Sequence, residues 1–90
     1  MTAFKQTYHD AYILLADRLK TARERAGLTQ MQVALLLQRS QSYITKCETG
    51  EKRIDVIELL VFATLYQHDL AFFTDGLIPL LTAGPETARD

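Results

Sequence analysis

The side chains best suited to binding a partner lie in the polar stretch from Gln41 to Glu48, which offers an amide, hydroxyls and an amine. These groups donate and accept hydrogen bonds. The apolar side chains of the stretch are Tyr43, Ile44 and Cys47. A helix formed here would therefore bury only a narrow stripe and leave most of its surface free for a partner.

No residue set is spaced for covalent or metal chemistry. Cys47 is the only cysteine, which excludes an internal disulfide and leaves no cysteine partner for a structural zinc site. Its helical spacing from Ile44 predicts a small buried apolar residue, with a redox switch as the weaker alternative. His9 and His68 have no ligand partners at useful spacing and no paired nucleophile. We therefore expect no enzyme activity, no metal and no cofactor.

The chain of 90 residues is long enough for one compact domain. The formal net charge is -1, but nine Lys and Arg stand against five Asp and Glu in residues 1–53, and one against six in residues 54–90. The chain thus has a basic front (net +4) and an acidic back (net -5). It shows neither a bilayer-spanning apolar run nor a secretory signal, so we expect a cytoplasmic location and no membrane partner.

Five short helices are expected to position the polar stretch. The first extends from about Asp10, a candidate N-cap, to Ala26, with Leu15, Leu19 and Ala22 recurring at three or four positions. Gly27 follows it, where a left-handed residue would close the helix.

The second and third helices form a pair separated by a tight turn. Thr29 with Gln32 is a capping-box pattern, which predicts a second helix over about 30–37. Ser40 is a good N-cap for a third helix, which Gly50 would stop near residue 48. A helix, a turn and a polar second helix together place side chains in a DNA major groove, whose width of about 12 Å accepts one α-helix.

The rest of the chain predicts two further helices and a tail. Asp55, with Glu58 at the capping-box position, begins a fourth helix, and a short fifth helix begins at Leu70. Pro79 and the stretch from Thr82 to Asp90, which is rich in small and charged residues, indicate a loosely ordered end. The expected organisation is an N-terminal extension over 1–9, a helical domain over 10–78 and a C-terminal tail over 79–90.

Several separated motifs resemble the Xre family of helix-turn-helix regulators, which includes the lambdoid phage repressors and Cro proteins. The resemblance covers roughly residues 15–73, with the motifs in the right order and spacing. It implies an all-α, five-helix lambda-repressor-like DNA-binding domain with the helix-turn-helix at helices 2 and 3. The motifs are Leu28-Thr29-Gln30, Val33-Ala34, Ser40 to Lys46, Glu48 to Arg53 and Asp55 to Leu60.

The resemblance also implies roles for individual residues. Gln41, Ser42 and Lys46 match base-contacting positions of the recognition helix, where a glutamine amide can meet adenine N6 and N7 together. Gln30 matches a phosphate-binding glutamine that in relatives can touch the residue equivalent to Gln41. The residues that match family positions beside the DNA backbone, and are therefore implied to contact phosphates, are Tyr43, Thr49, Lys52 and Arg53.

Three observations depart from that pattern or add to it. Arg39 is an additional phosphate-contact candidate, because a cation in the turn would lie near the DNA backbone. Gln38 occupies the turn position where the family usually has glycine, so it must tolerate left-handed geometry at a cost of about 1 kcal/mol. Cys47 replaces a larger apolar residue of relatives and would thin the core under the recognition helix.

The function implied is a sequence-specific transcriptional regulator of double-stranded DNA, acting as a repressor and as a homodimer on a pseudo-palindromic operator. A domain this small cannot easily bury all of its C-terminal apolar residues, so these are candidates for the dimer interface: Phe72, Phe73, Leu77, Ile78, Leu80 and Leu81. The alternative is an antitoxin-like module that binds another protein through this segment.

Overall fold

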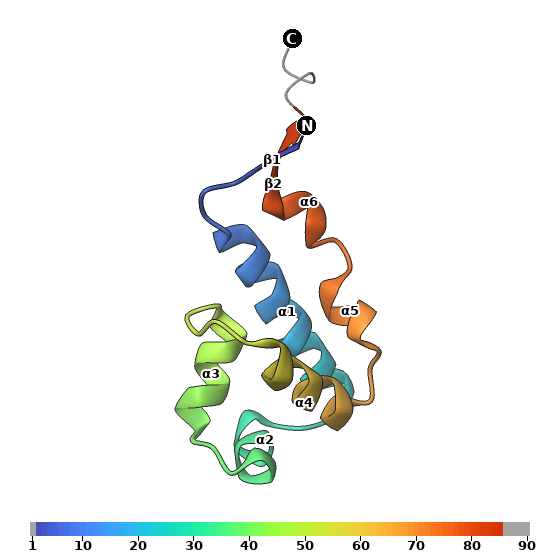
Figure 1. Cartoon of the computed structure of the whole chain (residues 1–90). Coiled ribbons are helices and arrows are strands. Elements are labelled where there is room, and N and C mark those ends of the chain that lie inside the picture. Colours follow the sequence, from blue (N-terminus) through green and yellow to red (C-terminus); the bar gives the residue numbers. More distant parts are fainter. Residues whose placement is uncertain (1, 86–90) are drawn as a thin grey trace.

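The computed structural model describes residues 2–85, and helices account for most of this range (Figure 1). The elements are β1 (Thr2–Phe4), α1 (His9–Arg25), α2 (Gln30–Leu37), α3 (Gln41–Thr49), α4 (Val56–Tyr66), α5 (Leu70–Thr74), α6 (Ile78–Leu81) and β2 (Thr82–Pro85). The predicted all-α domain, with its helix-turn-helix at α2 and α3, is confirmed. Within the described range, no helix has both the length and the apolar character that crossing a bilayer requires.

α1 is the helix on which much of the domain packs, since it contacts α3, α4, α5 and α6. Leu19 and Ala22 are completely buried and Leu15 nearly so, as their spacing along one helical face predicts. The N-cap expected at Asp10 is wrong. The helix begins after Tyr8, which makes no side-chain cap, and Asp10 lies in the first turn, where its charge favours the positive end of the helix.

The core beneath α2 and α3 is apolar. Cys47 is 1% exposed, and its burial raises the pKa of its thiol to about 11. The thiol is therefore protonated at neutral pH and inaccessible, which confirms the predicted small core residue. Besides the α1 residues, the buried members of this core are Val33, Ala34, Ile44, Cys47, Leu59, Phe62, Ala63, Tyr66 and Phe73.

α4 begins with the predicted capping box. The Glu58 N–H donates to Asp55 Oδ1 (2.7 Å), and the Asp55 N–H donates to Glu58 Oε1 (3.0 Å). α4 ends at Tyr66, and the next residue, Gln67, caps it in a left-handed conformation with φ 58°. The short helix α5 follows and inserts the fully buried Phe73 into the core.

The two ends of the described chain pair as an antiparallel ribbon, which Figure 1 shows at the opposite end of the molecule from α2. Ala3 pairs with Gly84 and Phe4 with Thr82. The loosely ordered tail expected over 79–90 is thus wrong as far as residue 85, because α6 and β2 lie there; residues 86–90 fall outside the described range. Pairing between segments almost 80 positions apart leaves no local pattern in the sequence.

Candidate nucleic-acid interface

α2 begins with a reciprocal pair of hydrogen bonds at Thr29, as predicted. The Gln32 N–H donates to Thr29 Oγ1 (3.1 Å), and the Thr29 N–H donates to Gln32 Oε1 (2.8 Å). The first N–H groups of a helix have no partner inside it, so this capping box satisfies one of them and defines where the helix starts.

The turn between α2 and α3 is built around a left-handed glutamine. Gln38 has φ 56° and ψ 46°, which confirms the geometry expected at the usual glycine position. The Arg39 N–H donates back to the Ala34 carbonyl oxygen (2.9 Å), closing the end of α2. Ser40 then caps α3, since its Oγ accepts a hydrogen bond from the Tyr43 N–H (3.1 Å).

α3 turns its apolar and polar residues to opposite sides. Ile44 and Cys47 are buried beneath the helix, whereas Gln41, Ser42 and Lys46 are exposed. The helix spans nine residues and ends at Thr49, and the next residue, Gly50, caps it with φ 84°. The three side chains implied to contact bases therefore lie together on a free surface of the domain.

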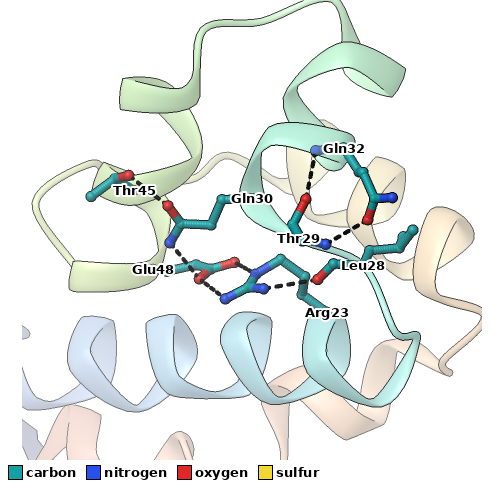
Figure 2. A network of polar contacts seen from close by, with 7 residues as sticks. All are labelled: Arg23, Leu28, Thr29, Gln30, Gln32, Thr45 and Glu48. Carbon is teal, nitrogen blue, oxygen red and sulfur yellow. Dashed lines mark hydrogen bonds and ion pairs between the residues drawn. The ribbon is translucent and has the colours of Figure 1, made fainter.

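A polar network joins α3 to α1 and α2 (Figure 2). The Arg23 guanidinium donates to both carboxylate oxygens of Glu48, from Nε at 2.7 Å and from Nη2 at 3.0 Å, and its Nη1 donates to the Leu28 carbonyl oxygen at 2.8 Å. Hydrogen bonding to Glu48 raises the pKa of Arg23 above its ordinary value. Paired bonds of this kind fix orientation as well as distance, so the network locks the carboxyl end of α3 to α1.

Gln30 belongs to the same network. Its Nε2 donates to Glu48 Oε1 (3.1 Å), and its Oε1 accepts a hydrogen bond from Thr45 Oγ1 (2.8 Å). Its side-chain bonds within residues 2–85 thus go to Thr45 and Glu48, and none goes to Gln41. The link between the two glutamines that the resemblance implies is absent from this structure, because Thr45 supplies the donor that the Gln30 oxygen needs.

A second cluster holds the amino end of α3 against α4. The Tyr43 hydroxyl donates to Glu58 Oε2 (2.7 Å), and Lys52 Nζ lies 3.3 Å from the same oxygen. The hydrogen bond from Tyr43 is the main cause that lowers the pKa of Glu58, and burial raises the pKa of Tyr43 well above its usual range. The Tyr43 ring also stacks on Phe62, with centroids 6.5 Å apart.

The remaining phosphate-contact candidates surround this cluster. Arg39 is exposed, with its guanidinium 4.8 Å from the centre of the Tyr43 ring, and Lys52 is partly exposed. Arg53 is exposed above the ring of Tyr12, at 5.5 Å. Thr49 is exposed near the end of α3. The structure therefore brings Arg39, Tyr43 and Lys52 together, whereas the Arg53 guanidinium lies over Tyr12.

The C-terminal residues predicted for a dimer interface do not share one environment. Phe73 is 0% exposed and belongs to the core of its own chain, so its assignment to an interface is wrong. Ile78 is exposed, and the other candidates, Phe72, Leu77, Leu80 and Leu81, are partly buried. The sequence cannot separate these residues, because their burial depends on how α5 and α6 fold back onto α1.

An apolar surface on α4 and the nearby end of α2 was not expected from the sequence. Ile57, Leu60 and Val61 are exposed and line a groove with Leu37. Leu35 is also exposed, at 72%. A signal was present, since α4 is apolar on all sides and a helix of that kind is normally buried.

A small helical domain that presents a capped polar helix after a tight turn has the architecture of a helix-turn-helix DNA-binding domain. Residues 14–71 match the family model described as a helix-turn-helix domain, and the chain belongs to this family. The helix-turn-helix domain that the motifs indicate is thereby confirmed.

Among solved structures, the chain is similar to the restriction-modification controller protein C.AhdI from Aeromonas hydrophila. The two have 24% identical residues and a TM-score of 0.63, and the match covers 69% of this chain and 94% of that chain. At this identity the likeness concerns the fold. No curated protein matches the chain.

Proposed function

We propose that the protein is a sequence-specific transcriptional repressor that binds double-stranded DNA as a homodimer on a pseudo-palindromic operator. The single observation that carries this proposal is the exposed polar face of α3, backed by the buried Ile44 and Cys47. Side chains on such a face can enter a major groove while the inner stripe keeps the helix on the domain.

In this proposal Gln41, Ser42 and Lys46 contact base edges. Lysine at the last position favours guanine O6 and N7 or a nearby phosphate. Gln30, through its amide, and Arg39, from the turn, contact the DNA backbone. The other backbone contacts come from Tyr43, Thr49, Lys52 and Arg53.

Lys52 and Tyr43 would approach the backbone from fixed positions. Both share the Glu58 carboxylate, which offsets part of the lysine charge but also restricts its side chain. The contribution of Lys52 to affinity should therefore be similar for all sequences, since phosphate contacts carry no sequence information.

A homodimer is proposed because one α3 helix contacts too few base pairs to be selective, and paired half-sites lie about 34 Å apart. The exposed residues of α4, Ile57, Leu60 and Val61, support such an interface because they form an apolar surface. The exposed Ile78 and the partly buried apolar residues of α5 and α6 are the second candidate surface. Charged substitutions at Leu60 and at Ile78, followed by measurement of molar mass in solution, distinguish the two.

Selection of bound duplexes from a random pool tests the proposal. A consensus with two-fold symmetry is the expected outcome, and replacement of Gln41 by alanine should reduce discrimination at one half-site position by about 1–3 kcal/mol. Lys52→Ala is the matched control, because it should weaken all duplexes alike. A pool without enrichment would contradict the proposal.

The apolar surface on α2 and α4 also favours a second candidate, an antitoxin-like module that binds another protein. The two candidates differ in how the purified chain behaves. A homodimer that binds the DNA upstream of its own gene supports the repressor, whereas a chain that aggregates alone and binds no DNA supports the protein-binding module.

A further inference from the structure

The Gln30 carboxamide is held at both of its ends by the recognition helix. Its oxygen accepts from Thr45 Oγ1 at 2.8 Å, and its nitrogen donates to Glu48 at 3.1 Å (Figure 2). Gln30 and Thr45 are both only partly buried. The amide is thus fixed by α3 and yet remains within reach of a ligand.

The Gln30 carboxamide retains a hydrogen-bond donor for a ligand. A glutamine side chain has two N–H donors and one oxygen. Glu48 accepts from one of these N–H groups, and the oxygen accepts one hydrogen bond from Thr45. One N–H therefore remains for an acceptor outside the protein, such as a phosphate oxygen.

Two hydrogen-bond partners are needed to fix the orientation of the Gln30 amide, because the last torsion angle of a glutamine side chain has a broad, roughly two-fold distribution. Glu48 is itself held by two bonds from Arg23, so it attracts the amide nitrogen from a fixed position. That contact alone leaves the amide free to rotate around it. The Thr45 hydroxyl removes this freedom, since a flipped amide would direct its oxygen at the carboxylate and lose both bonds.

We infer that Thr45 is a positioning residue for the DNA contact of Gln30: its hydroxyl fixes the carboxamide so that the remaining N–H meets a backbone phosphate. This inference rests on the proposed function. Thr45 follows Gln41 by one helical turn, so it links the base-reading face of α3 to the start of α2. The phosphate contact and the base contacts would then keep a constant spacing.

The test uses the duplex selected from the random pool, together with copies that carry one uncharged methylphosphonate at each backbone position in turn. Thr45→Val removes the hydroxyl and keeps the side-chain shape, and Thr45→Ser keeps the hydroxyl. We expect the valine variant to bind the unmodified duplex about fivefold more weakly, as for one lost hydrogen bond, and the serine variant to bind like the natural chain. Thermal unfolding establishes that each variant is folded at the assay temperature, and Thr45→Ala replaces the valine variant if that one is not.

The methylphosphonate series separates positioning from a general structural effect. The natural chain should lose affinity at one phosphate, and both Thr45→Val and Gln30→Ala should become insensitive there. Adding Thr45→Val to Gln30→Ala should cause no further loss. Retained sensitivity in Thr45→Val, or losses that multiply in the double variant, would overturn the inference while leaving DNA binding intact. Failure of the natural chain to bind any duplex would overturn the proposed function and this inference together.

Discussion

The two polar clusters that hold α3 differ in how far water reaches them. At the carboxyl end of the helix, the Arg23 and Glu48 side chains are 11% and 4% exposed and lie 2.7 Å apart. At the amino end, the Lys52 and Glu58 side chains are 33% and 18% exposed and lie 3.3 Å apart. Charges are screened less where water is excluded, so the first pair depends far more on both partners being present.

This difference indicates that the two ends of α3 have different roles. The Arg23–Glu48 pair joins α1 to α3, and the bond from Gln30 to Glu48 adds α2, so the network makes the helix-turn-helix one rigid unit. The cluster of Tyr43, Glu58 and Lys52 lies nearer to solvent, where a salt bridge contributes little to stability, and its side chains remain available to a partner.

The largest effect should come from removing one member of the buried pair. Glu48→Ala leaves Arg23 with only its bond to the Leu28 carbonyl, and we expect a loss of about 3 kcal/mol in the free energy of unfolding. Urea unfolding followed by circular dichroism measures it. Glu24→Ala, at an exposed acidic residue of α1, should change stability little. A loss as small as that of the control would break the comparison.

A smaller effect is expected at the amino end of α3. Tyr43→Phe removes one hydrogen bond to Glu58 and keeps the stacking on Phe62, so the unfolding free energy should fall by about 1 kcal/mol. The exposed Tyr8 provides the control, because Tyr8→Phe removes a hydroxyl that is accessible to water. If Tyr43→Phe cost as much as Glu48→Ala, the two ends of α3 would not differ as the structure indicates.

Part of the loss of folding stability at low pH should come from the cluster of Tyr43, Glu58 and Lys52. The pKa of Glu58 is lowered, first by the hydrogen bond from Tyr43, so its carboxylate stabilises the fold above the ordinary value of 4.5. That contribution is lost as the pH falls through the lowered pKa of the folded state. Urea midpoints at pH 7 and pH 3 should therefore differ less for Glu58→Gln than for the natural chain. An unchanged difference would assign the acid response to other groups.

The smallest effect concerns the turn that leads into α3. Gln38 and Gln67 have nearly the same left-handed geometry, with φ 56° and φ 58°. Glycine at either position relieves the Cβ strain of the folded state, but it also makes the unfolded chain more flexible, which offsets part of the gain. The free energy of unfolding of each variant should therefore rise by a few tenths of a kcal/mol. Thermal melting of Gln38→Gly and Gln67→Gly checks this. A gain at Gln67 alone would show that the turn before α3 has further constraints.

Local signals accounted for much of the candidate interface. The capping box at Thr29, the N-cap at Ser40 and the glycine at Gly50 predicted the bounds of α2 and α3 closely, because each signal acts within a few residues. The inward placement of Ile44 and Cys47 followed from helical spacing. The bonds from Arg23 and Gln30 to Glu48, and from Tyr43 to Glu58, did not follow from any pattern, since these partners lie 15 to 25 residues apart in the chain.

In the C-terminal segment, the sequence likewise did not predict which apolar residues are buried. Leu77, Ile78 and Phe73 are all large apolar residues, yet Phe73 is completely buried and Ile78 is largely exposed. Spacing along a short helix does not reveal which face will contact α1, because that depends on how all the helices pack around the core.

The sequence by itself determined where the helices of the helix-turn-helix begin and end, and which side of α3 is polar. These properties depend on hydrogen bonds and spacing within one or two helical turns. Only the tertiary structure decided that Thr45 and Glu48 hold Gln30, that α4 exposes an apolar surface, and that the two ends of the described chain pair. Each of these requires residues far apart in the chain to meet, and that depends on how all the helices pack together.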